Sequence, residues 1–263
     1  MNMVLIRIAL SFVIAGAWIA SVTYFGERLG SRKAGLLGNM PSNILISLLF
    51  MGITKGPEYA AASTAGVPMG MMIDTIFLAV FIFTIPHGLW IALPASFAAW
   101  ALAAILVLAV LPPLGFLASI AAYIVVTAAL FFLVSAELGV KHVEKKPVKF
   151  SWKVSLIRAF FAGSVVAGAV AIAQVAPPYM TGVLATFPAV MTSTMVILVR
   201  SQGSDFARAT GKILILSSCN IIVFSTCAGL LFVALGPWLG TLLAYAASIC
   251  SILLIDRLTV KVR

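Results

Sequence analysis

The chain has 263 residues, of which 63% are hydrophobic and 9% are charged. Soluble domains carry about 25% charged residues, so this composition excludes a soluble globular fold and indicates a protein that crosses a membrane several times. The apolar segments are continuous and do not alternate with polar residues, which excludes an outer-membrane barrel. The net charge of +10 is attributed to loops beside the membrane, and we expect no nucleic-acid partner.

Each helix that spans a bilayer needs about 20 apolar residues. By this criterion we predict an all-α, polytopic bundle of nine transmembrane helices, over residues 4–25, 35–53, 68–86, 90–111, 115–136, 154–175, 180–199, 212–234 and 237–256. Five helices precede a basic linker and four follow it. The predicted organisation is therefore an N-terminal membrane repeat over residues 1–136, a cytoplasmic linker over 137–153 and a C-terminal membrane repeat over 154–263.

One stretch of the chain occurs twice without a gap, because Gly182 and the residues after it match Gly35 and the residues after it at a constant offset of 147. An odd number of helices in the first half makes the second copy enter the membrane from the opposite side. We therefore predict two inverted-topology repeats, an arrangement typical of transporters with a site between the repeats. The matched pairs are Gly35/Gly182, Pro41/Pro188, Gly56/Gly203, Glu58/Asp205, Tyr59/Phe206, Ala60/Ala207 and Ala62/Ala209.

The basic residues are distributed unequally between the two sides of this predicted topology. With the N-terminus outside, 15 of the 17 Lys and Arg residues fall on one side, and only Arg7 and Lys55 fall on the other. By the positive-inside rule the basic side is cytoplasmic, which predicts a multi-pass inner (plasma) membrane protein with a cytoplasmic C-terminus. We expect the bilayer to be a partner of the chain, with anionic lipids at the basic cytoplasmic loops.

The second copy carries three short motifs, Tyr179–Gly182, the pair Phe187–Pro188 and Ala207–Thr210. In these motifs it resembles the GlpM family of small bacterial inner-membrane proteins, over about residues 155–256. The first copy resembles that family more weakly, because it lacks the Phe-Pro pair and the arginine. The resemblance implies a helical membrane fold, and it implies no particular substrate.

The two prolines of the repeat lie inside their predicted helices, each six residues after the first glycine of the repeated stretch, Gly35 or Gly182. A proline there removes one helical hydrogen bond and leaves a carbonyl, that of Leu37 or Leu184, in need of another partner. Polar residues gather beside each proline. Around Pro41, the residues Asn39, Asn43 and Ser47 are spaced four apart and therefore share one helix face. We interpret them as a substrate or ion site between two kinked helices, and the alternative is hydrogen bonding between helices as packing contacts. The candidate residues are Asn39, Pro41, Ser42, Asn43, Ser47, Thr186, Pro188, Thr192, Ser193 and Thr194.

Asp74 is the one acidic residue well inside an apolar stretch. A charged group there costs at least about 2.5 kcal/mol on insertion scales, so such residues usually face a polar interior. We interpret Asp74 as a proton-coupling or cation-binding carboxylate. The alternative is a hydrogen-bonded aspartate near a helix end, only about 9 Å from the outer boundary of the predicted helix. Asn220 is the candidate uncharged counterpart in the second copy.

Several other residues receive simpler interpretations. Glu58 and Asp205 each begin a helix, where the helix dipole favours an acid, and the alternative is a gate. His87 is expected to be exposed, and Trp100, the deepest tryptophan, to pack. The cysteines have no CxxC spacing and are expected to be buried side chains; they are Cys219, Cys227 and Cys250.

The sequence contains no P-loop, GxSxG or HExxH motif, so we expect neither an enzyme nor a cofactor, and no metal is indicated. The leading hypothesis is a secondary transporter or permease of a small polar solute or ion. The alternatives are a membrane enzyme or lipid-handling protein, and a non-transporting partner in an envelope assembly. The motif Gly66-x3-Gly70 leaves a homo-oligomer open.

Overall fold

The computed structural model describes residues 3–28, 40–138 and 151–261 of the chain. All regular secondary structure in these ranges is helical, as the sequence predicted. The helices are α1 (Met3–Arg28), α3 (Ser42–Lys55), α4 (Pro57–Ser63), η1 (Thr64–Gly66), α5 (Val67–Thr84), η2 (Ile85–His87), α6 (Leu89–Ile105), η3 (Leu106–Val110), α7 (Phe116–Leu138), α8 (Trp152–Ile172), α9 (Pro178–Leu184), α10 (Ala189–Gln202), α11 (Ser204–Ser217) and α12 (Cys219–Lys261).

Seven helical segments in the described ranges are long and apolar enough to cross a membrane, which confirms a multi-pass membrane protein. Large apolar side chains also remain exposed on the outside of the bundle, where lipid would cover them, including Trp90, Leu117, Phe132 and Leu230. The segments are Met3–Val22, Pro57–His87, Leu89–Val110, Phe116–Glu137, Trp152–Ile172, Pro178–Gln202 and Ser204–Leu253.

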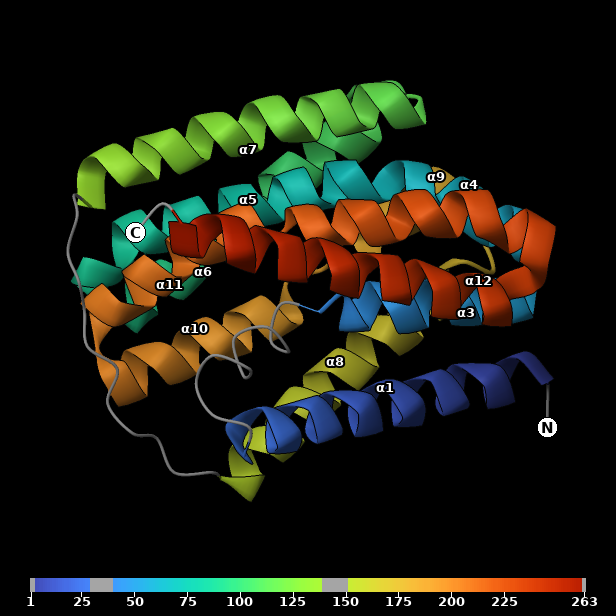
Figure 1. Ribbon diagram of the computed structural model, residues 1–263, viewed down its shortest axis with the longest axis horizontal. Helices are drawn as coiled ribbons and strands as arrows, with labels where there is room; N and C mark the ends of the chain where they lie inside the picture. The colour runs from blue at the N-terminus through green and yellow to red at the C-terminus, as the bar shows by residue number, and fades with distance from the viewer. Residues whose placement is uncertain (1–2, 29–39, 139–150, 262–263) are drawn as a thin grey trace.

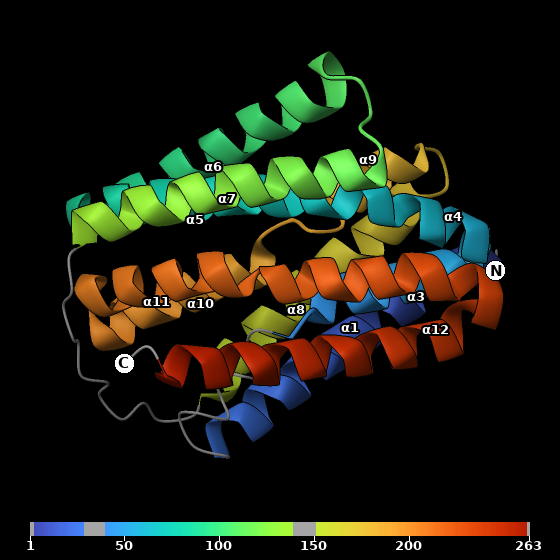
Figure 2. The same cartoon turned by 45° about the horizontal axis from the view of Figure 1, so that its top comes forward.

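The count of nine helices stays a prediction, because residues 35–39 of the second predicted helix lie outside the described residues. The segment Ser204–Leu253 is 50 residues long and has a non-helical break at Gly236, with φ 75°. After this break α12 folds back along itself (Figures 1 and 2). This one segment therefore contains two membrane-length arms.

Two predicted helix starts are wrong. The helix expected over 68–86 is preceded by α4 and η1, so the helical run begins at Pro57, and the helix expected over 212–234 begins at Ser204. Hydropathy missed both starts because their first turns contain charged residues, Glu58 in α4 and Asp205 in α11. Helix N-termini favour acids, so these polar turns are helical.

The helices α1 and α8 form an antiparallel pair. The Tyr24 ring, late in α1, stacks on Trp152 at the start of α8 with centroids 5.8 Å apart. Further along, a β-carbon on Gly163 of α8 would lie 2.7 Å from the carbonyl oxygen of Phe12. Residue numbers at these contacts decrease along α1 as they increase along α8, so the two helices run in opposite directions.

The helices α3 and α10 are bounded in the same way. Each has 14 residues, and the residue before each is a proline, Pro41 with φ −74° and ψ 51° and Pro188 with φ −78° and ψ 42°. Each is followed by a glycine with positive φ, Gly56 at 100° and Gly203 at 98°, a conformation that a β-carbon disfavours. Both helices begin near the middle of the bundle and run to opposite ends (Figures 1 and 2).

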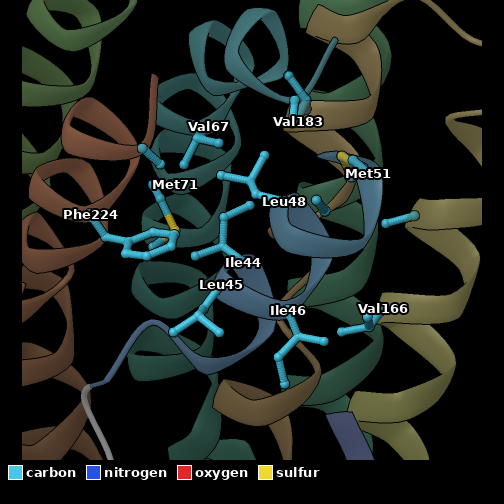
Figure 3. Close-up of a cluster of buried hydrophobic side chains, with 14 of the residues drawn as sticks. Ile44, Leu45, Ile46, Leu48, Met51, Val67, Met71, Val166, Val183 and Phe224 are labelled. Atoms are coloured by element: carbon cyan, nitrogen blue, oxygen red, sulfur yellow. The ribbon is translucent and has the colours of Figure 1, made fainter. Parts of the chain in front are cut away.

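The main core surrounds α3. Figure 3 shows Ile44 and Leu48 of α3 beside Val67 and Met71 of α5, with Phe224 of α12 next to them, and these residues belong to one buried apolar cluster. The start of α3 is thereby fixed against two helices of the interior. Large side chains that pack closely in this way tolerate little movement of the backbone.

Two glycines bring η1 and α9 into backbone contact. A β-carbon on Gly182 would collide with the carbonyl oxygen of Ser63, and one on Gly66 would collide with the carbonyl oxygen of Tyr179. Such close approach between helices in a membrane requires small residues at the crossing. This contact fixes α9 beside the helix that carries Asp74.

Gly182→Ala should therefore lower the stability of the protein by about 1–3 kcal/mol, since the added methyl group meets a backbone carbonyl that cannot rotate away. Gly168→Ala is the matched control, because a β-carbon on Gly168 in α8 meets nothing within 4 Å and alanine favours a helix. Unfolding of both purified variants in detergent micelles checks this. Equal loss of stability in the two variants would contradict the described crossing.

Candidate functional site

Asp74 lies in the middle of the helical run from Pro57 to His87. At 1.5 Å per residue its Cα is roughly 25 Å from the start of this run and roughly 20 Å from its end. The helical run before Asp74 is longer than expected, because α4 and η1 precede α5 and the run begins at Pro57 and not at residue 68. The hydrogen bond of the alternative interpretation is present. The side chain is 1% exposed.

The carboxylate of Asp74 has a single neutral hydrogen-bond donor. The indole Nε1 of Trp100 in α6 donates to Asp74 Oδ1 at 3.0 Å. Within the ranges that the structure describes, no other side chain donates to this carboxylate and no basic side chain forms an ion pair with it. A carboxylate so placed keeps oxygen lone pairs available for a proton or a cation.

A run of aromatic contacts starts at Trp100, the donor to this carboxylate. Trp100 meets the ring of Phe187 edge to face with centroids 4.9 Å apart, and Phe187 stacks on Phe97 at 5.9 Å. Phe97 meets Phe77 at 5.2 Å, and Phe77 lies one helical turn after Asp74 on α5. The contacts thus form a circuit of four rings that leaves α5 at Asp74 and returns to α5 one turn later at Phe77, by way of α6 and the segment between α9 and α10.

The segment between α9 and α10 is a break in the helix and not a kink. The predicted continuous helix over 180–199 is wrong, because α9 ends at Leu184 and α10 begins after Pro188. The Leu184 carbonyl, expected to lack a helical partner, accepts from the Phe187 N–H at 3.2 Å. Pro188 has no N–H to lose at the start of a helix, which makes this position favourable.

Thr186 in this break faces the helix of Asp74. Its hydroxyl donates to the Val183 carbonyl at 2.8 Å, and its side chain fills the space that a β-carbon on Gly70 would occupy. Gly70 lies one turn before Asp74 on the same face of α5. The structure thus places Asp74, Thr186 and Pro188 in one region, which we call the break site and define by Asp74, Trp100, Thr186, Phe187 and Pro188.

The candidate residues on α3 form a separate group. Asn39 lies outside the described residues, and Pro41 is the residue before α3 and not inside a helix. Ser42 N–H donates to the Met40 carbonyl at 2.7 Å. Asn43 Oδ1 and Ser47 Oγ are buried without a hydrogen-bond partner among the described residues. They share one face of α3, and no hydrogen bond joins them to Asp74 or to Thr194.

The candidates on α10 are held locally or by another helix. Thr192 donates to the Pro188 carbonyl at 2.7 Å, and Ser193 donates to the Val190 carbonyl at 2.9 Å. Thr194 accepts from the Nη2 of Arg158 in α8 at 2.8 Å. Arg158 was assigned to the cytoplasmic charges, yet its guanidinium reaches into the bundle. Thr194 is therefore held by α8 and forms no hydrogen bond with the side chains of the break site in the described ranges.

Asn220 is fully buried at the start of α12, and its backbone carbonyl accepts from Ser248 at 3.4 Å. Its expected equivalence to Asp74 has no support from the glycines that end the two runs, since Gly236 follows Gly88 by 148 residues. Counted with that offset, Ile222 corresponds to Asp74. Asn220 lies 146 residues after Asp74, one fewer than the repeat offset of 147, whereas the glycines give one more.

The remaining candidates lie away from this region. Glu58 and Asp205 are exposed in the first turns of α4 and α11, where the helix dipole favours an acid. His87 is exposed as expected. Cys250 is exposed and not buried. In the described ranges, no group of three or more His, Cys, Asp or Glu side chains could hold a metal ion.

Comparison of the chain with family models, curated proteins and solved structures gives no match. The description of the site therefore depends on its own geometry. Sequence reasoning missed the roles of Trp100, Phe187 and Arg158. The signals were present, because Trp100 is the deepest tryptophan, Phe187 precedes the repeated proline, and Arg158 follows several apolar residues of a predicted span.

Trp100→Phe keeps an aromatic ring but removes the donor to Asp74, and it should lower the free energy of unfolding by about 1–3 kcal/mol. In an Asp74→Leu background the same change should cost much less, because no carboxylate is left without its donor. Trp90→Phe, on the same helix at a residue 93% exposed, is the control. Denaturant titration in mixed micelles measures all four variants. Equal costs in both backgrounds would argue against the Asp74–Trp100 interaction.

Proposed function

We propose that the chain is an integral membrane secondary transporter or permease, and that a small polar solute or ion crosses the bundle past Asp74. The observation that carries this proposal is the position of that carboxylate, 1% exposed in the middle of a membrane-length helical run. Ionisable residues at such depth are costly and usually mark a substrate or ion path. Packing alone would be served by an uncharged side chain.

The helix break beside Asp74 supports the same function. Interrupted helices expose backbone groups and helix ends at membrane depth, which proteins use where a solute binds. Through Phe187 the α9–α10 break contacts Trp100, the donor to Asp74, and through Thr186 it contacts Gly70, one turn before Asp74. The start of α3 adds a second helix end near the middle of the bundle (Figure 2). There Asn43 and Ser47 carry buried polar atoms that find no hydrogen-bond partner among the residues that the structure describes.

The two halves share helix lengths and the residues that bound their helices, which supports an inverted repeat. The helices α3 and α10 begin 147 residues apart and share their length and their flanking proline and glycine. Gly88 and Gly236 both have positive φ, and each is followed two residues later by a tryptophan. The helices that begin the two halves, α1 and α8, run in opposite directions. An inverted repeat with Pro41 on Pro188 accounts for all these features.

The same proposal fixes an orientation in the inner membrane, with the N-terminus outside and the C-terminus cytoplasmic. It rests on the asymmetry of Lys and Arg and on the start of α1 and the end of α12 at opposite ends of the bundle (Figure 1). Anionic lipids would then contact the basic linker over 137–153. Labelling of a cysteine in that linker from outside intact cells would refute the orientation.

The likeness to the GlpM family agrees with this membrane placement and adds no substrate. A membrane enzyme or lipid-handling protein would need several reactive side chains close together near one surface. The exposed acids Glu58 and Asp205 lie in separate helices, and in the described ranges neither forms a hydrogen bond with a reactive side chain. The buried carboxylate therefore favours transport over the enzyme alternative.

Uptake by proteoliposomes across a panel of ions and small metabolites tests the proposal. Asp74→Asn should abolish coupled uptake or reduce it at least about tenfold, which corresponds to about 1.4 kcal/mol, while keeping the fold through the amide oxygen. Glu137→Gln is the matched control, because Glu137 is an exposed carboxylate at the end of α7 and should leave uptake unchanged. Full uptake by Asp74→Asn would exclude Asp74 from the transport path.

A further inference from the structure

The circuit of rings that starts and ends beside Asp74 combines a carboxylate with aromatic side chains, which together favour one class of ligand. We infer that Asp74, Trp100, Phe187, Phe97 and Phe77 bind a small organic ammonium ion, which is the class of solute that the protein carries. This inference rests on the proposed transport function and goes beyond it by naming that class. It depends on three properties of the site, which are its charge, its lack of oxygen ligands and its aromatic wall.

The charge of the site selects a cation. The carboxylate of Asp74 accepts one hydrogen bond from a neutral indole, and within the described ranges no arginine, lysine or histidine forms an ion pair with it. Arg158, the basic side chain that enters the bundle from α8, donates to Thr194. An anion beside Asp74 would add like charge in a medium of low dielectric constant, which is strongly unfavourable.

The scarcity of oxygen disfavours a hard metal ion. Calcium and magnesium need about six or more oxygen ligands, from carboxylates, carbonyls or water. Of the five side chains in the circuit only Asp74 carries oxygen. The Thr186 hydroxyl, which donates to the Val183 carbonyl, would add at most one further oxygen ligand. A cation that carries its own apolar surface does not need such a ligand shell.

The aromatic wall matches that surface. Phe187 contacts both Trp100 and Phe97 at ring distances of 4.9 and 5.9 Å, and Phe97 contacts Phe77 at 5.2 Å. A cation near the face of an aromatic ring is attracted by its quadrupole, and quaternary ammonium groups are bound by aromatic cages in this way. The carboxylate supplies the charge, and the rings supply contact with the methyl groups.

The test is binding of radiolabelled choline to the purified protein in detergent, with 3,3-dimethylbutan-1-ol as competitor. This alcohol has the shape of choline with carbon in place of the ammonium nitrogen. Choline and tetramethylammonium should compete at least about tenfold more strongly than the neutral alcohol. No saturable choline binding, or equal competition by the neutral alcohol, would overturn the inference in the unmodified protein.

Variants separate this site from general packing. Asp74→Asn should weaken choline binding at least about tenfold, and Phe187→Leu about three- to thirtyfold, with little change for the neutral alcohol. Phe132→Leu is the control, because Phe132 lies 70% exposed on α7. Equal loss for choline and for the alcohol in Phe187→Leu would overturn the aromatic contribution.

Choline flux into proteoliposomes distinguishes the two proposals. Binding through Asp74 without flux would support the ammonium site and refute the transport function. Flux of a neutral or anionic solute by a protein that does not bind choline would support transport and refute the ammonium site.

Discussion

The arrangement of the middle of this bundle depends on the hydrogen bond from Trp100 to Asp74. A carboxylate buried among apolar side chains costs free energy unless donors or cations meet it, and the indole N–H is the one side-chain donor to it in the described ranges. The bond joins α5 to α6, and the edge-to-face contact of Trp100 with Phe187 continues to the break between α9 and α10. Three separate parts of the chain are thus positioned around one polar group.

Close backbone contact supports the same region from the other side. Gly66 and Gly182 bring η1 and α9 together without side chains between them, and Gly70 accommodates Thr186. Helices in a membrane gain little from the hydrophobic effect against each other, so their association depends on such close packing. The break site is held by small residues on one side and by aromatic rings on the other. A solute that enters it would have to displace ring contacts and not backbone ones.

The sequence predicted the class of fold and placed Asp74 inside an apolar helix, because both follow from composition and hydropathy. It paired the prolines and glycines of the repeat, since a repeated motif reveals them without any structure, but it placed both prolines inside helices, where the structure has them just before α3 and α10. It did not predict the helical start at Pro57, because the charge of Glu58 lowers the hydropathy of a first turn that the helix dipole nevertheless favours. It could not predict the pairing of Asp74 with Trp100, which depends on how α5 packs against α6.

The proposed transport past Asp74 requires that this residue be reached from both sides of the membrane. Asp74→Cys in a background without Cys219, Cys227 and Cys250, in oriented vesicles, tests it most directly. A charged, membrane-impermeant methanethiosulfonate reagent is added to one side at a time. The account predicts that the cysteine is modified from either side in turn, while a cysteine in place of lipid-facing Leu117 is not. No modification of the cysteine at position 74 from either side would contradict it.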